Sequence, residues 1–154
     1  MLQAHAGANV LMLFDSWSGM VPSSKREMVV TKTHQKIIQS VRDRGYNQPF
    51  ISFPKGLSEG LVSYCDNVDI ACIGLDHLTD MRWAAQEIRS DIVLQGNLDP
   101  LCLVEGGEQM KREVGHIMEA VGARSHVFNL GHGIVPHTPQ KHVSDLINMV
   151  RSYG

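Results

Sequence analysis

The chain has 154 residues, of which 43% are hydrophobic and 19% are charged. This length suits one ordinary domain, and the apolar fraction is far too high for a disordered chain. The 14 Lys and Arg residues are balanced by 16 Asp and Glu residues, giving a formal net charge of −2. A nucleic-acid partner is therefore not expected, because such proteins carry an excess of basic residues.

Cysteine usage and hydropathy indicate the redox environment of the chain and whether a membrane partner is expected. Three cysteines at scattered positions do not make a disulfide framework, so we expect a reducing, cytoplasmic environment. The sequence contains no apolar run near the roughly 18 residues of a membrane span, so we expect no membrane partner.

The chain opens on a short Ala-rich segment that ends at Gly7. A glycine just past the last helical residue is a common helix end, so this segment is predicted to be the last turn of a helix. We therefore expect the chain to begin within an element.

Five short apolar runs predict five strands. Each run has the length of a strand and is followed by a polar or glycine-rich cluster. Continuous apolar runs, as opposed to strict alternation, are typical of strands buried on both faces in parallel sheets. The predicted strands lie at 10–14, 50–53, 70–75, 92–95 and 126–130.

Helical patterns fill the intervals between these strands. Apolar residues recur there at helical spacing, and glycines close two of the segments. The predicted helices cover 24–44, 58–65, 79–89 and 107–121, followed by a closing helix with Thr138 as N-cap and Pro139 in its first position. Strands that alternate with helices indicate an α/β fold of five β-α units. A small doubly wound sheet remains one interpretation of this pattern.

Polar side chains follow three of the predicted strands. In α/β folds ligands bind beyond the carboxyl ends of the strands, and here those ends carry Ser16, Lys55 and His132. Lys55 and His132 can meet anionic groups, and the Ser16 hydroxyl can donate or accept a hydrogen bond. Each also has a structural interpretation: a turn or cap residue for Ser16, a solvated loop charge for Lys55, and a structural histidine for His132. Asp15 and Asp99 are likewise typical of residues that cap a turn or helix.

Motifs for metals and nucleotide cofactors are missing from the sequence. His132, His137 and His142 are spaced by five, which does not align them on one helix face. Neither H-E-x-x-H nor C-x-x-C occurs, and neither the dinucleotide fingerprint nor the P-loop occurs. We therefore expect no metal site and no nucleotide cofactor.

The strand-end motifs resemble those of the uroporphyrinogen decarboxylase family. They occur in the order and approximate spacing of that family's carboxyl-terminal half, and the resemblance covers essentially the whole chain. The motifs are FDSWSG at 14–19, QGNLDP at 95–100 and NLGHGI at 129–134, followed by Pro136 and Thr138-Pro139, with FPKG at 53–56 and GLD at 74–76 between them.

This resemblance implies a (β/α)8 barrel enzyme, a carboxy-lyase of haem biosynthesis. The family removes CO2 from the four acetate arms of uroporphyrinogen III, giving coproporphyrinogen III, without metal or organic cofactor, and usually as a homodimer. Such a barrel takes roughly 250 residues, or about 31 per unit, so five units need about 155. We therefore expect residues 1–154 to form the carboxyl-terminal part of a barrel from which the amino-terminal units are absent.

The resemblance also assigns roles to individual residues. Ser16 matches a family serine or threonine that contacts substrate, and His132 matches a histidine that binds a substrate carboxylate or polar edge. Lys55 is our own electrostatic addition for a highly acidic substrate. The family's arginine-rich loop, catalytic aspartate and substrate-binding tyrosine have no match here, so no catalytic residue is assigned to this chain.

Two functional hypotheses follow. In the first, the chain is part of a decarboxylase and is active only with a complementary amino-terminal segment. In the second, it is a non-catalytic fragment that binds tetrapyrrole or self-associates, because five strands of a barrel leave two open edges.

A related branch, the cobalamin-dependent methyltransferases, is disfavoured because its zinc-binding His-x-Cys pair does not occur and His132 stands where its further cysteine falls.

Overall fold

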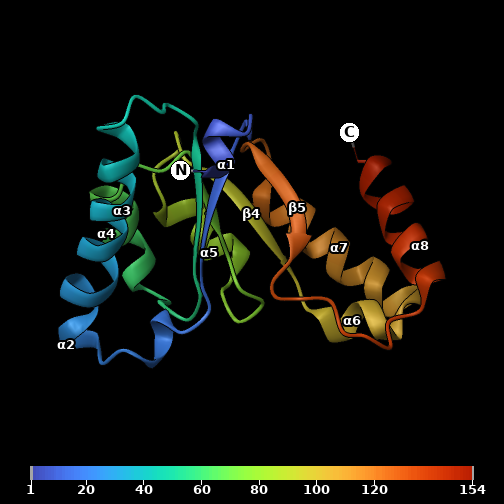
Figure 1. The fold of residues 1–154 in the computed structure, drawn as a ribbon. Coiled ribbons are helices and arrows are strands. Elements are labelled where there is room, and N and C mark those ends of the chain that lie inside the picture. Colours follow the sequence, from blue (N-terminus) through green and yellow to red (C-terminus); the bar gives the residue numbers. More distant parts are fainter. Residues whose placement is uncertain (1, 154) are drawn as a thin grey trace.

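Five parallel strands form one sheet in the computed structural model, which describes residues 2–153 (Figure 1). The strands are β1 (Leu11–Asp15), β2 (Phe50–Pro54), β3 (Cys72–Gly74), β4 (Val93–Leu98) and β5 (His126–Leu130). Their order in the sheet follows the chain, and each neighbouring pair is parallel. A doubly wound sheet needs a point where the strand order reverses, so that interpretation is wrong. The sequential order is that of a barrel segment, as predicted.

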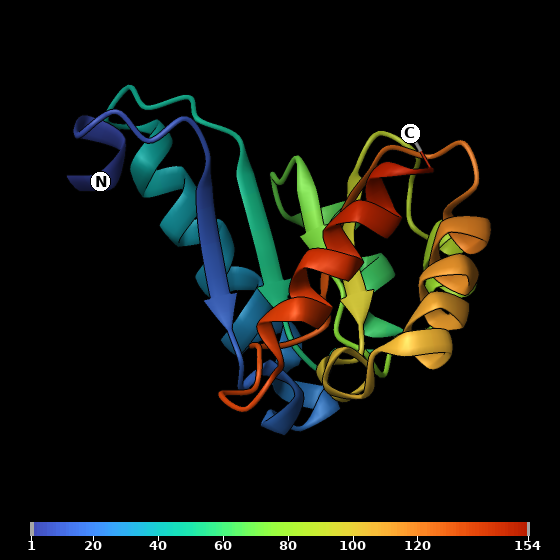
Figure 2. The ribbon, with the colours of Figure 1, turned by 90° about the vertical axis from the view of Figure 1, so that its right-hand side faces the viewer.

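Helices lie outside the curved sheet, and the strand arrowheads visible in Figure 2 point to one common edge. The helical elements comprise α-helices, one 3-10 turn (η1) and one π-helical stretch (η2). They are α1 (Leu2–His5), η1 (Ser18–Met20), α2 (Ser23–Arg26), η2 (Glu27–Thr31), α3 (Lys32–Arg42), α4 (Gly60–Asn67), α5 (Met81–Glu87), α6 (Pro100–Glu105), α7 (Gly107–Val121) and α8 (Gln140–Arg151).

Most predicted elements are present with shifted ends. The predicted helix at 24–44 is formed by α2, η2 and α3 in succession. The short helix α1 is followed by Gly7 at a φ of 98°, which confirms the expected helix end. The helix predicted from Ser58 begins at Gly60, because Ser58 has a φ of 52° outside the helical region.

Two details at helix starts correct the sequence-based prediction. Pro139, and not Thr138, is the N-cap of α8, because its ψ of 129° keeps it extended. The short helix α6 was not predicted. It begins at Pro100 directly after Asp99, whose side chain accepts a hydrogen bond from Leu101 N–H. This is the usual arrangement of an N-cap followed by proline in the first helical position.

The hydrophobic core lies between the sheet and the helices. Ile73 of β3, Leu94 of β4 and Val114 of α7 are fully buried there, and α3 contributes Ile38. The opposite, inner face of the sheet is less covered. Phe14, on the edge strand β1, is 70% exposed. Among the described helices, none is long and apolar enough to cross a membrane.

Candidate functional site

A cavity of about 310 Å³ lies on the inner face of the sheet, where the strands end. Its wall is mainly apolar, with a few polar side chains. The lining residues are Met12, Phe14, Phe53, Gly74, Leu75, Gln95, Asn129, Leu130, His132, Gly133 and Ile134. A concave, mainly apolar surface with a few polar groups is typical of a small-molecule site.

A larger cavity of about 620 Å³ lies among α5, α6 and α7, with His77, Arg82 and Glu105 on its wall. Neither Ser16, Lys55 nor His132 lines it. We take the inner cavity as the candidate site because each of the five strands contributes at least one residue to its wall, and the fold predicts a ligand site on this side.

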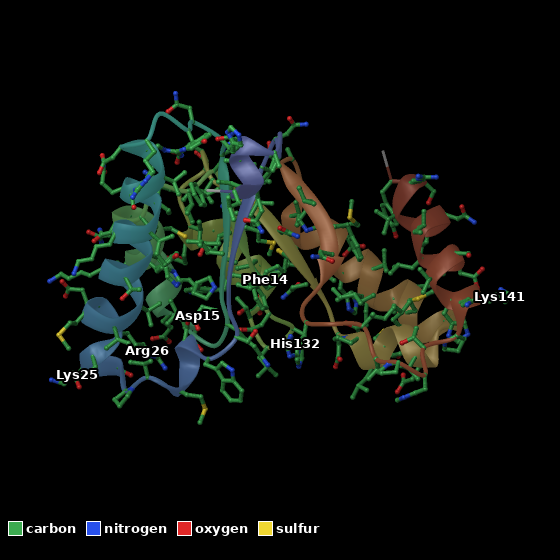
Figure 3. All side chains as sticks on the ribbon, viewed as in Figure 1. Phe14, Asp15, Lys25, Arg26, His132 and Lys141 are labelled. Atoms are coloured by element: carbon green, nitrogen blue, oxygen red, sulfur yellow. The ribbon has the colours of Figure 1, made fainter. Side chains whose placement is uncertain are left out.

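His132 lies on the wall of the inner cavity, in the loop after β5. Figure 3 shows it at the same edge of the molecule as Phe14 and Asp15. Gly131 fixes this loop, because its N–H donates to the Leu98 carbonyl at 2.8 Å. A Cβ atom on Gly131 would lie 2.7 Å from the Cα of His77, so only glycine fits this approach. The His132 side chain itself is exposed.

Ser16 lies in the turn between β1 and η1, where it is exposed. The preceding residue, Asp15, organises this turn. Its Oδ1 accepts a hydrogen bond from Trp17 N–H at 3.2 Å, and its carbonyl accepts one from the Ser18 hydroxyl at 3.3 Å. A carboxylate that accepts from the N–H two residues ahead forms an Asx-turn, so the structural interpretation of Asp15 is confirmed.

Lys55 is half-buried in the loop after β2, directly beside the Ser16 turn. Its N–H donates to the Asp15 carbonyl at 3.0 Å, and its own carbonyl accepts from Gly19 N–H at 2.8 Å. The two loops touch at glycines, since a Cβ on Gly19 would lie 2.9 Å from the Cα of Gly56. The loops that carry Ser16 and Lys55 are therefore tied together through their backbones.

The three predicted residues thus lie at one edge of the sheet, but they do not all line the same cavity. His132 lines the inner cavity, whereas Ser16 and Lys55 lie on the loops around it and are not among its lining residues. Their part in binding remains a prediction.

A neighbouring cation and two further carboxylates hold the loops in place. The guanidinium of Arg26 donates to the carbonyls of Gly19, Val21 and Leu57 at 3.0–3.3 Å. The buried Asp76 accepts hydrogen bonds from backbone N–H groups on two loops. Asp99 caps α6, which confirms its structural interpretation.

The cysteines are unsuited to thiolate chemistry. Burial raises the pKa of Cys65 to about 12 and the pKa values of Cys72 and Cys102 to about 11 each. All three are therefore protonated near neutral pH. Among the described residues, no three His, Cys, Asp or Glu side chains are grouped so that they could hold a metal ion.

One polar network was not predicted from the sequence. His34 lies between Asp15 and Tyr64, and Tyr64 in turn contacts Ser52. A usable signal was present, because His34 follows Val30 and precedes Ile38 by four residues, so it occupies the apolar stripe of its helix. A histidine on such a stripe indicates a buried polar partner.

Comparisons with known proteins agree with the strand-end motifs. The family model for uroporphyrinogen decarboxylase (URO-D) matches residues 2–153. The uroporphyrinogen decarboxylase of Granulibacter bethesdensis is 42% identical over 97% of this chain and 44% of its own length. That of Novosphingobium aromaticivorans is 41% identical over 99% of this chain and 45% of its own length. The chain therefore spans less than half the length of these relatives.

A solved structure supports the fold. A methyltransferase from Methanosarcina mazei superposes with a TM-score of 0.79 at 19% identity, covering 97% of this chain and 43% of that protein. At this identity the likeness concerns the fold alone. From its sequence, this chain belongs to the uroporphyrinogen decarboxylase family.

Proposed function

We propose that this chain supplies substrate-binding residues to a uroporphyrinogen decarboxylase and that a complementary segment supplies the catalytic carboxylate. The reaction releases CO2 from each of the four acetate arms of uroporphyrinogen III and leaves methyl groups, giving coproporphyrinogen III. The observation that carries the proposal is the position of His132 on the wall of an apolar cavity, in a chain that the family model matches over residues 2–153.

The composition of the cavity suits such a substrate. A porphyrinogen has apolar pyrrole rings and carboxylates at its periphery. Phe14 and Phe53 pack edge to face, with ring centroids 5.9 Å apart, and both line the cavity where pyrrole rings would lie. His132 and the Ser16 hydroxyl would then donate hydrogen bonds to peripheral carboxylates, and Lys55 would attract the acidic substrate.

The chemical step requires a group that we do not assign to this chain. Protonation of a pyrrole carbon forms a cation, and the bond between the methylene carbon and the carboxylate then breaks with release of CO2. Protonation of the methylene carbon completes the methyl group, and loss of the proton first added to the ring carbon restores the neutral pyrrole. A nearby carboxylate would stabilise the cation. The aspartates at the strand ends have structural partners instead: Asp15 holds a turn, Asp76 holds two loops, and Asp99 caps α6. We therefore expect the isolated chain to be inactive.

The open edges of the sheet support a complementary partner. Strands β1 and β5 each pair on one side only within the described sheet. Phe14 on β1 is largely exposed, and Val127 on β5 is 47% exposed. Further β-α units that pair with both edges would cover these side chains and close the barrel.

A reconstitution experiment tests the proposal. The chain is mixed with the portion of the Granulibacter bethesdensis relative that it does not match, and complex formation is followed by light scattering. Decarboxylation of uroporphyrinogen III is then measured by chromatography of the oxidised products. We expect activity from the complex and none from either part. A well-folded complex without product would contradict the proposal, as would turnover by the purified 154-residue chain.

Within the same complex, His132→Asn tests the binding site. Because an imidazole–carboxylate hydrogen bond contributes on the order of 1.5–3 kcal/mol, we expect the KM to rise by about tenfold or more. His137→Asn is the matched control, since His137 is exposed and does not line the cavity. Equal KM values for the two variants would remove His132 from the site.

Exposed apolar side chains favour a second candidate, a non-catalytic chain that self-associates or binds tetrapyrrole. Trp17 is 73% exposed and Met20 is 76% exposed, both near the Ser16 turn, and Ile134 is exposed beside His132. Exposed apolar side chains of this size at one end of the sheet would favour a homo-oligomer. Light scattering of the wild-type chain and of Phe14→Ser, with a uroporphyrin titration, tests this candidate. A monomer without porphyrin affinity would exclude it.

A further inference from the structure

Four polar side chains form a chain of contacts behind the Ser16 turn. Asp15 Oδ2 lies 3.5 Å from His34 Nε2, and His34 Nδ1 lies 2.7 Å from the Tyr64 hydroxyl oxygen. That hydroxyl lies 2.6 Å from Ser52 Oγ. The four residues come from β1, α3, α4 and β2, so the contacts link two strands through two helices. His34, Tyr64 and Ser52 are buried.

The contacts admit one consistent order of hydrogen bonds around a neutral imidazole. Burial lowers the pKa of His34, and Asp15 opposes this effect only in part, so the neutral form prevails at pH 7. The Ser52 hydroxyl then donates to the Tyr64 oxygen, and the Tyr64 hydroxyl donates to Nδ1 of His34. The remaining proton of the ring lies on Nε2 and points toward the Asp15 carboxylate.

Asp15 connects this network to two of the predicted binding residues. Its other carboxylate oxygen, Oδ1, accepts the hydrogen bond from Trp17 N–H that closes the turn around Ser16. Its carbonyl accepts the N–H of Lys55. The orientation of one carboxylate therefore affects the turn that presents Ser16, and the same residue anchors the loop of Lys55.

We propose that His34 is a positioning residue, which holds the Asp15 carboxylate in the orientation that closes the Ser16 turn. The inference rests on the proposed role of Ser16 in substrate binding. His34 touches no substrate in this arrangement, because it lies in the helix layer and not on the wall of the inner cavity. A buried imidazole on an apolar helix stripe is costly unless its nitrogens are hydrogen-bonded, and here both nitrogens face polar partners.

Two substitutions of similar polarity distinguish a positioning role of His34 from a role in packing alone. The amide nitrogen of His34→Gln reaches toward the position of Nε2 and keeps a donor for Asp15. The shorter side chain of His34→Asn reaches only the position of Nδ1, so it keeps a partner for Tyr64 and loses Asp15. Both variants are uncharged, and both leave a polar group in the network.

The first measurement is amide hydrogen exchange by NMR on the 154-residue chain. We expect His34→Asn to speed exchange of the Trp17 amide by about tenfold, because the acceptor carboxylate is no longer held, and His34→Gln to keep the wild-type rate. The Leu101 amide is the internal control, because it donates to a different carboxylate, Asp99, at 2.9 Å. Equal Trp17 exchange in both variants would overturn the proposal.

The second measurement is kinetic, on the reconstituted complex. We expect His34→Asn to raise the KM for uroporphyrinogen several-fold at unchanged kcat, and His34→Gln to restore the wild-type KM. If the wild-type complex shows no decarboxylation, the proposed function fails, while Trp17 exchange still decides the role of His34. If the wild-type complex is active and the His34→Asn complex has the same KM as the wild type, the positioning role of His34 fails and the proposed function stands.

A third readout needs no variant. Ring nitrogen chemical shifts of His34 in the wild-type chain at pH 7 report which nitrogen carries the proton. We expect the proton on Nε2. A neutral ring protonated on Nδ1 would leave Nε2 without a donor for Asp15 and would overturn the proposal even if a variant failed to fold.

Discussion

The backbone N–H of Gly56 donates to Oδ2 of the buried Asp76 at 2.8 Å, which joins the loop after β2 to the loop after β3. Similar bonds join the other strand ends. Lys55 N–H donates to the Asp15 carbonyl, and Gly131 N–H donates to the Leu98 carbonyl. The loops around the candidate site are therefore supported by one another, so a change in one loop affects its neighbours.

Removing the Asp76 carboxylate is predicted to be strongly destabilising. It accepts the N–H groups of Gly56 and Leu78 and the hydroxyl of Thr79, all at 2.8–3.2 Å. Because a hydrogen bond to a charged group contributes roughly 1.5–3 kcal/mol and these three are partly buried, we expect Asp76→Ala to lower the free energy of unfolding by about 2–4 kcal/mol. Urea denaturation measures this.

Asp66→Ala is the control for Asp76→Ala, since Asp66 is exposed on α4. We expect its free energy of unfolding to stay within about 0.5 kcal/mol of the wild type. Comparable losses in both variants would mean that the Asp76 contacts do not stabilise the loops.

The strands could be predicted from the sequence because their side chains are apolar on both faces. Ile73 and Leu94 face the helices, while Phe53 and Gly74 face the cavity, so the runs read as continuous. Helix α6 was missed because six residues are too few to display a helical period, although Asp99 gave a cap signal.

The site was predictable only as far as it depends on strand ends. His132 follows β5 directly, so its place on the cavity edge follows from the topology. The network around His34 depends on side chains far apart in the chain, since His34 and Tyr64 are separated by 30 positions. Such a contact is set by how α3 and α4 pack, which no local pattern describes.

Alanine substitutions at the two glycines that flank His132 are predicted to differ sharply in their effect on stability. A side chain on Gly131 would collide with the backbone of His77, whereas a Cβ on Gly133 meets no atom within 4 Å. We expect Gly131→Ala to lower the free energy of unfolding by about 3 kcal/mol or more, because backbone atoms cannot move aside cheaply. Gly133→Ala should change it by less than about 1 kcal/mol. Thermal unfolding of both variants checks this, and equal melting temperatures would refute it.

Arg124 is predicted to stabilise the end of α5. Its guanidinium donates to five carbonyls at 2.7–3.4 Å, those of Ala84, Ala85, Ile88, Arg89 and Ile92. The last carbonyls of a helix lack partners of their own. We therefore expect Arg124→Ala to lower the free energy of unfolding by about 2–4 kcal/mol in urea denaturation. Arg82→Ala, at an exposed position on α5, should change it by less than about 0.5 kcal/mol.

Stability is predicted to fall in mild acid because of two histidines. Burial lowers the pKa of His34 and of His126, whose Nε2–H donates to the Gly96 carbonyl at 2.7 Å. Below the usual histidine pKa of 6.5, the unfolded chain therefore binds protons that the folded chain does not. The free energy of unfolding should fall as the pH drops from about 6.5 toward the folded-state pKa values, by at most about 1.4 kcal/mol per pH unit for each histidine.

Urea denaturation at a series of pH values from 7.5 to about 5 measures this dependence, a window that lies above the usual pKa values of carboxyl groups. His34→Gln and His126→Gln should each remove part of the slope, because neither glutamine binds a proton in either state. His137→Gln, at an exposed position, should leave the slope unchanged. A stability that does not vary with pH in the wild-type chain would show that neither the buried His34 nor the half-buried His126 resists protonation.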